Sequence, residues 1–420
     1  MSKIHVSSEI GKLKRVIVHR PDRGIARISP RRAEELLFDD IVFLPKMQEE
    51  HDIFTNVLKR FIGEENVLET QTLLEECFGI DVEIKEELID MAISYEELPT
   101  YTKKTLMNLP DDELARVLIT GYYPAEEHIL FDPIPNFIFT RDIAVTVNDH
   151  IIITKASKEA RARENLLTRY IIRTHPCFKS LVDEKKIINL NMIDDFPPSK
   201  RNEKVSIEGG DVMIINKDYL LIGCSERTTT HAVRSLAKVL FEKNIVSNVA
   251  MIDVPNERSF MHIDTLFTQI NPTDFVGYKP IVVDGHGSNV EVIHKNGTNT
   301  KYLSIEAFLK AEINPNIRII HAGKGISPYQ EREQWTDGCN LVTIKPGVAL
   351  TYDRNPWTED AFKEAGYRVV YAIDLLKAFD DGILTPDEVK NTIITLPSTE
   401  LSRARGGSHC MTCPIEREEI

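Results

Sequence analysis

The chain contains 420 residues, of which 65 are acidic and 51 are basic, so its formal net charge is −14. Hydrophobic residues make up 42% of it and charged residues 28%, a composition typical of folded domains and unlike that of disordered or membrane proteins. The negative charge disfavours binding to nucleic acid and favours cationic small substrates. The length fits two or three domains, or one large domain that carries an insertion.

The N-terminus and the cysteines indicate the compartment. The opening residues MSKIHVSS lack the apolar run of a signal peptide, and no uninterrupted apolar stretch of about 18 residues follows. Six cysteines are too few for a disulfide framework in a chain of this length. We therefore expect a cytoplasmic protein without a membrane segment.

A strand, a turn, a second strand and a helical stretch recur along the chain. The pattern is clearest in residues 137–155, where two β-rich runs flank Asn148-Asp149, and in the helical spacing of 160–173. Residues 205–223 and 228–243 repeat it. Weaker copies are residues 13–19 with a helix over 46–62, residues 280–294 with 303–312, and residues 340–353 with 357–366.

The recurrence indicates the fold class. About five units are predicted, and because one unit cannot cover both faces of its own strands, they indicate a closed, quasi-symmetric α/β assembly. An ordinary α/β sheet with coincidental spacing is the alternative interpretation.

Residues 72–118 differ from these units. They contain 12 acidic and 4 basic residues, and their short helical patterns are interrupted at Gly79, Pro99 and Pro110. We predict a small helical insertion within a domain that spans residues 1–420, and we interpret its charge as a solvated surface.

Acidic residues stand at the same point of two repeats. The segment FTRD places Asp142 in an otherwise apolar strand, and EGGD places Glu208 and Asp211 beside two glycines that permit close backbone approach. Taken singly, each of these acids is more simply explained as a helix-capping or strand-edge residue than as a functional one. Because quasi-symmetry brings equivalent points together, we expect Asp142 and Glu208 to meet at a common centre.

A third acid follows in the segment MHID. Residues Ser259 to Phe267 have the composition of a strand, in which positions i and i+2 share a face. His262 and Asp264 are therefore expected to point the same way. A surface pair is the alternative, and for this segment taken alone it is the simpler one.

The C-terminal segment RARGGSHCMTCP presents a thiol beside two glycines. Cys410 and Cys413 fit a redox pair, but such pairs usually open a helix, and Pro414 follows here. With His409 they fit half of a zinc site, although no second half is present in the sequence. The interpretation we favour is that Cys410 is a catalytic nucleophile that works with His262.

The acids allow two kinds of ligand. Asp142, Glu208, Asp264 and His262 form a set that suits a metal ion. A planar guanidinium is the other choice, since carboxylates bind its N–H groups in pairs and would hold its central carbon against Cys410.

These segments resemble a known family. The motifs FTRD (139–142), EGGD (208–211), SERT (225–228), MHIDT (261–265) and RGGSHCMTCP (405–414), in this order, are similar to those of arginine deiminases in the guanidine-modifying pentein superfamily. The resemblance covers essentially the whole chain. It implies a five-bladed propeller of ββαβ units that hydrolyses L-arginine to citrulline and ammonia, without a metal or an organic cofactor.

The resemblance also implies roles for residues. Cys410 would form the covalent amidino intermediate and His262 would act as general acid and base. Asp142 and Asp264 would hold the guanidinium, while Glu208 would support His262 and a substrate nitrogen. The remaining substrate contacts would be Asn136, Arg161 and Arg227 on the carboxylate, Phe139 on the aliphatic stem, and Arg405 as a mobile gate near Leu37. Arg163 is the alternative to Arg161.

The expected partner is therefore a small molecule, L-arginine, and we expect no binding to nucleic acid or to a membrane. The chain is also expected to form a homo-oligomer. Alternatives within the class are hydrolases of agmatine or methylarginine and amidinotransferases. An alternative from another class is a redox protein that uses Cys410 and Cys413.

Overall fold

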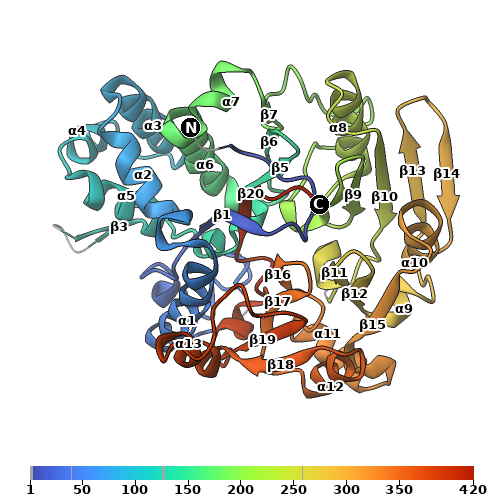
Figure 1. The fold of residues 1–420 in the computed structure, drawn as a ribbon. Coiled ribbons are helices and arrows are strands. Elements are labelled where there is room, and N and C mark those ends of the chain that lie inside the picture. Colours follow the sequence, from blue (N-terminus) through green and yellow to red (C-terminus); the bar gives the residue numbers. More distant parts are fainter. Residues whose placement is uncertain (1–2, 39, 125–127, 258) are drawn as a thin grey trace.

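The structure is a computed structural model that describes residues 3–38, 40–124, 128–257 and 259–420. It is a mixed α/β protein in which the strands form several sheets and most helices lie toward the outside (Figure 1). Among the described residues, no helix is both long and apolar enough to cross a membrane.

Five sheets in the described part of the chain share one order of strands. In each, two strands pair antiparallel, and a third pairs parallel with one of them after a crossover that contains a helix. Parallel neighbours require such a crossover. The strand–strand–helix unit predicted from the sequence is therefore present and is followed by a parallel strand in four of the sheets, whereas in the first sheet the antiparallel partner of β1 is β20 from the C-terminal end of the chain.

The bounds of the strands are as follows. The first sheet contains β1 (Leu13–Val18), β2 (Val67–Glu69) and β20 (Cys413–Arg417), and the second contains β5 (Ala144–Val147), β6 (His150–Ile153) and β7 (Ile187–Asn189). The third contains β8 (Val212–Asn216), β9 (Tyr219–Cys224), β10 (Asn248–Asp253), β13 (Val290–His294) and β14 (Asn299–Tyr302). The fourth contains β11 (Phe267–Gln269), β12 (Asp274–Gly277) and β15 (Arg318–His321), and the fifth contains β16 (Val342–Lys345), β17 (Val348–Tyr352), β18 (Arg368–Tyr371) and β19 (Thr392–Leu396). A separate hairpin joins β3 (Tyr122–Tyr123) and β4 (His128–Ile129).

The crossover helices follow the predicted spacing. They are α1 (Leu44–Ile62), α6 (Ala162–Thr174), α8 (Thr230–Glu242), α10 (Ile305–Phe308) and α12 (Pro356–Glu364). The turn at Asn148-Asp149 is confirmed as well, since Val147 pairs with His150 and Asn148 has a φ of 50°. Asparagine tolerates this left-handed conformation, which a two-residue hairpin needs.

The prediction for residues 280–294 is wrong. The antiparallel pair of this unit is β11 with β12, which lies earlier in the chain, and Lys279–Val282 form the short helix α9. Pro280 stands in the first turn of that helix, where its fixed φ and missing N–H favour helix initiation. Strand β13 instead extends the neighbouring sheet beside β10.

Four helices lie between the first and second sheets in chain order. They are α2 (Thr70–Phe78), α3 (Val82–Tyr95), α4 (Thr102–Met107) and α5 (Asp111–Thr120). Leu74, Ile89 and Leu118 from these helices pack in one hydrophobic cluster with Leu167 of α6. Burial of these side chains fixes the four helices against the second sheet's crossover helix. The remaining helices are α7 (Lys179–Asp183), α11 (Tyr329–Trp335) and α13 (Ala372–Asp380).

Candidate active site

A cavity of about 580 Å³ contains most of the residues selected from the sequence. Nine of them line it: Leu37, Asn136, Phe139, Asp142, Arg161, Arg227, His262, Arg405 and Cys410. Glu208 and Asp264 are fully buried behind this lining and bond to residues in it. Segments that are far apart in the sequence therefore converge on one enclosed space.

Three short helical turns carry the acids and the imidazole. Thr140–Asp142, Gly209–Asp211 and Ile263–Thr265 are 3-10 turns that precede β5, β8 and β11. The prediction that Asp142 lies within a strand, and that His262 and Asp264 share a strand face, is therefore wrong. The second and third turns are each fixed by a carboxylate of the turn before: Asp142 Oδ1 accepts from the backbone N–H of Gly210 at 2.9 Å, and Asp211 Oδ1 accepts from that of Ile263 at 2.9 Å.

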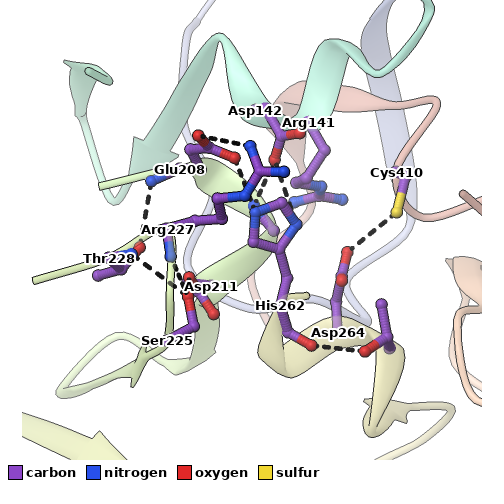
Figure 2. Close-up of polar contacts among 12 residues, drawn as sticks. Arg141, Asp142, Glu208, Asp211, Ser225, Arg227, Thr228, His262, Asp264 and Cys410 are labelled. Atoms are coloured by element: carbon purple, nitrogen blue, oxygen red, sulfur yellow. Dashed lines mark hydrogen bonds and ion pairs between the residues drawn. The ribbon is translucent and has the colours of Figure 1, made fainter. Parts of the chain in front are cut away.

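His262 lies against Gly210 and two carboxylates. A Cβ atom on Gly210 would lie only 2.5 Å from His262 Nδ1, so this position requires glycine. His262 Nε2 is 2.9 Å from Glu208 Oε2, and Nδ1 is 3.9 Å from Asp142 Oδ1 (Figure 2). Burial alone would lower the pKa of His262, but the charges of Asp142 and Glu208 and the hydrogen bond to Glu208 raise it to about 10. The imidazole is therefore protonated at neutral pH.

Cys410 faces a carboxylate and an amide. The Asp264 carboxylate points toward the sulfur, with Oδ2 at 3.5 Å from Sγ (Figure 2). Asn340 Nδ2 donates to Sγ at 3.2 Å. Burial and the charges of Asp264, Asp142 and Asp337 raise the pKa of the Cys410 thiol well above its usual value. The surroundings of Cys410 therefore favour the neutral thiol over the thiolate.

Asp264 is anchored by His409 on one oxygen and unpartnered on the other. Oδ2 is 2.8 Å from His409 Nδ1, and the second ring nitrogen of His409 is 3.2 Å from Glu9 Oε2. Oδ1 is buried, and no described residue forms a hydrogen bond with it. Burial opposes the charge of Asp264, but the hydrogen bond and charge of His409 hold its pKa below the usual value. A buried, ionised carboxylate with an unpartnered oxygen suits a cationic ligand.

The arginines separate into two groups. Arg161 and Arg227 line the cavity, whereas Arg163 donates Nε to Leu118 O at 2.9 Å and pairs with Glu96. Arg161 donates to Asp142 Oδ2 at 2.6 Å and to Glu164 Oε2 at 2.8 and 3.0 Å. Burial opposes its charge, but the charges of Glu164, Asp142 and Glu208 raise the pKa of Arg161 well above its usual value.

The remaining predicted contacts also line the cavity. The Cζ atom of Arg405 lies 3.5 Å from the ring centroid of Trp335, a cation–π contact, and Arg405 and Leu37 both have positive φ angles of 64° and 57°. Asn136 Nδ2 donates to the backbone oxygen of Leu36 at 2.8 Å. Phe139 packs so closely on Gly406 that a Cβ atom there would lie 2.3 Å from its ring.

The structure supports neither the redox pair nor the zinc site that were the alternatives for the Cys410 segment. All six cysteines are free thiols, and Cys413 donates to the backbone oxygen of Ala144 at 3.2 Å. Both ring nitrogens of His409 already face carboxylates. Asp142, Glu208 and His262 do place ligand atoms within 4.8 Å of one another, as a metal site would, but the Arg161 guanidinium already lies against both carboxylates.

Four further residues belong to the site and were not identified from the sequence. Asn340 bonds to Cys410, and Asp337 and Trp335 line the cavity. Glu164 anchors Arg161. The only signal for Glu164 was its spacing, because residues i and i+3 of a helical turn are neighbours. Asn340 begins the weak repeat 340–353 without a motif that indicates a site, and Asp337 and Trp335 precede that repeat.

Solved structures of other proteins show the fold class of the chain. An amidinotransferase of saxitoxin biosynthesis from Microseira wollei superposes with a TM-score of 0.53 at 11% identity, covering 99% of this chain and 98% of that one. A dimethylarginine dimethylaminohydrolase from Pseudomonas aeruginosa superposes with a TM-score of 0.50 at 13% identity, covering 96% and 99%. The chain thus has the fold of these guanidine-modifying enzymes.

Sequence comparison defines the family within that class. The family model for arginine deiminase matches residues 34–417. The arginine deiminase of Limosilactobacillus fermentum is 36% identical with full coverage of both chains, and that of Pediococcus pentosaceus is 34% identical with 99% coverage of both. The chain belongs to the arginine deiminase family.

Proposed function

We propose that the protein hydrolyses L-arginine to L-citrulline and ammonia through a covalent intermediate on Cys410. The observation that carries the proposal is the one cavity in which Cys410, His262 and the Asp142 carboxylate meet, in a chain of the arginine deiminase family. The buried and unpartnered Oδ1 of Asp264 supplies a further acceptor for a guanidinium beside the sulfur.

The first half of the reaction needs a thiolate that the free site disfavours. A bound guanidinium offsets the carboxylate charges that raise the pKa of Cys410, so the substrate itself activates its nucleophile. The sulfur attacks the central guanidinium carbon, and the bond from that carbon to one terminal nitrogen breaks. His262 donates its proton to this nitrogen, which leaves as ammonia, so the imidazole is left neutral. The proton that Cys410 loses when the thiolate forms is released to solvent, where it converts the product ammonia to ammonium.

The second half consumes water. His262, now neutral, removes a proton from a water molecule that attacks the carbon of the amidino-cysteine. The carbon–sulfur bond breaks, the sulfur regains a proton and citrulline is released. Glu208 keeps the imidazole oriented through its 2.9 Å bond to Nε2. No step of this sequence requires a metal ion or an organic cofactor.

The rest of the cavity is proposed to select the substrate. Arg161 and Arg227, with Asn136, would bind the carboxylate, Phe139 would pack on the stem, and Arg405 beside Leu37 would close the entrance. The burial of Arg161 and Arg227 and the place of Arg405 at the lining support this assignment. A ligand without a carboxylate would leave buried charges unpaired and be rejected.

At the level of architecture, we propose that the five ββαβ sheets are the blades of a pentein propeller. Their common strand order and the convergence of their turns on one cavity support this arrangement. Residues 1–420 would form one catalytic domain with the helical insertion 72–118, and the chain would assemble as a homo-oligomer in the cytoplasm. Light scattering of the purified protein measures the assembly.

A citrulline assay tests the proposed function. We expect wild-type protein to form citrulline from arginine, Cys410→Ala to lose this activity, and Cys413→Ala to retain it. Cys413 is the matched control because it is a buried thiol in the same segment that does not line the cavity. Turnover that survives in Cys410→Ala, or transfer of the amidino group to an added amine in place of water, contradicts the proposal.

A further inference from the structure

The guanidinium group of Arg161 lies against Asp142, one of the carboxylates proposed to hold the substrate guanidinium. Its Nη1 atom is 2.6 Å from Asp142 Oδ2 and 3.4 Å from Glu208 Oε2. Its side chain is nearly fully buried yet belongs to the cavity lining. The structure therefore already holds one guanidinium against the two carboxylates.

The hydrogen-bonding capacity of these carboxylates is largely used. Asp142 Oδ1 accepts from Gly210 N–H and Oδ2 accepts from Arg161. Glu208 Oε2 faces His262, and Oε1 accepts from the backbone N–H of Ser157 at 3.0 Å. A second guanidinium beside Asp142 would also lie next to the positive charge of Arg161, which repels it.

Arg161 has an alternative acceptor if it leaves Asp142. Its Nε and Nη2 atoms both donate to Oε2 of Glu164, and Glu164 Oε1 is buried without a partner. Nη1 can therefore leave Asp142 while the guanidinium stays on Glu164. A buried oxygen without a partner costs free energy. The state in which Arg161 has left Asp142 is therefore favoured where a ligand supplies the contacts that Asp142 and Arg161 then lack.

We propose that Arg161 is an internal occupant of the guanidinium subsite, and that a ligand carboxylate draws it away to open that subsite. The inference rests on the proposed function and adds a coupling between the two ends of the substrate. Recognition of the carboxylate becomes a condition for binding the guanidinium. A ligand without a carboxylate cannot form the ion pair with the arginines, and it also finds the guanidinium subsite occupied by Arg161.

Calorimetric titration with methylguanidinium tests this coupling without turnover. Because the subsite is vacated, we expect Arg161→Ala to bind this probe roughly tenfold more tightly than wild type. Arg227→Met is the matched control. Arg227 lines the same cavity and lies 3.7 Å from Glu208 Oε1, but the described bonds to Asp142 come from Gly210 and Arg161 and not from Arg227. This variant should bind the probe no more tightly than wild type. Equal or weaker binding by a folded Arg161→Ala protein overturns the inference.

A second measurement needs no substitution and remains informative if Arg161→Ala does not fold. L-Norvaline carries the carboxylate and amine of the substrate without a guanidinium. If its carboxylate withdraws Arg161, saturating norvaline should tighten methylguanidinium binding by wild type about fivefold or more. Unchanged or weakened binding overturns the inference. These bindings are measured apart from citrulline formation, so failure of the coupling and failure of the proposed function are distinguishable.

Discussion

Asn340 holds Cys410 by two groups at once: Nδ2 donates to Sγ at 3.2 Å, and Oδ1 accepts from the backbone N–H of Cys410 at 3.2 Å. Oδ1 also accepts from the N–H of His409 at 3.1 Å. A Cβ atom on Gly407 would lie 2.5 Å from this oxygen, so the glycine permits the contact. The amide therefore fixes the loop that presents the nucleophile.

Removal of this amide should slow the reaction and raise the pKa of the thiol further. We expect Asn340→Ala to lower kcat about 10- to 100-fold, since a hydrogen bond to a charged group contributes about 1.5–3 kcal/mol. Asn340→Asp keeps the shape, but its carboxylate opposes the thiolate. It should shift the pH profile of kcat/KM to higher pH more than Asn340→Ala does. Profiles of both variants that coincide with wild type contradict the role.

The pKa of Cys410 gives a second prediction. Burial and the nearby carboxylates raise it, so the free protein should show little thiolate at pH 7, and the thiolate fraction should increase as the pH rises above the usual range of a cysteine. The ultraviolet absorbance of wild type minus that of Cys410→Ser reports this fraction. A non-reacting arginine analogue should increase it at pH 7. A free enzyme that is largely thiolate at pH 7 contradicts activation by the substrate.

Gly210 provides a test of the packing under His262. In Gly210→Ala the new methyl group would lie 2.5 Å from Nδ1, so the imidazole must move away from its carboxylates. We expect kcat to fall by roughly 100-fold or more, because small displacements of a catalytic group have large effects. Gly79→Ala is the control, since its φ is −78° and the nearest atom would be 4.0 Å away. Similar activities of the two variants would show that His262 tolerates displacement.

The sequence predicted the elements that local signals specify. The hairpin at Asn148-Asp149 and the helices α6 and α8 follow from a turn signal and from helical periodicity, and both operate over a few residues. It did not predict the 3-10 turns before β5, β8 and β11. These turns are set by bonds such as that from Gly210 N–H to Asp142, which join residues 68 positions apart.

Composition and resemblance selected residues that gather around one cavity, but they did not predict which of these residues contact one another. The acids, His262 and Cys410 stand out in the sequence because they are polar residues in otherwise apolar segments or beside glycines. The position of Arg161 on Asp142, and that of Asn340 on Cys410, depend on contacts across 19 and 70 residues. Such contacts exist only once the sheets have assembled, so spacing along the chain carries no signal for them.

Asp337 gives a prediction about stability. Its Oδ2 is buried without a partner, and burial together with the charge of Asp264 raises its pKa to about 7 despite the nearby charge of Arg405. A carboxyl group with a raised folded pKa costs stability as the pH rises from the unfolded value, 3.8, to 7, by on the order of 4 kcal/mol in total. Asp337→Asn should therefore gain stability relative to wild type between pH 5 and 8. A difference in Tm that is constant over this range contradicts the prediction.

The raised pKa of His262 depends on Glu208 in a testable way. Burial lowers it, so its value of about 10 requires the charges of Asp142 and Glu208 and the hydrogen bond to Glu208. Glu208→Gln keeps the size of the side chain and removes its charge, so the imidazole should lose its proton at a lower pH than in wild type. NMR titration of the ring measures this directly. Because the proposed reaction needs a protonated His262 to expel ammonia, the alkaline limb of kcat should move in the same direction. Identical ring titrations in the two proteins would mean that Glu208 does not control the proton on His262.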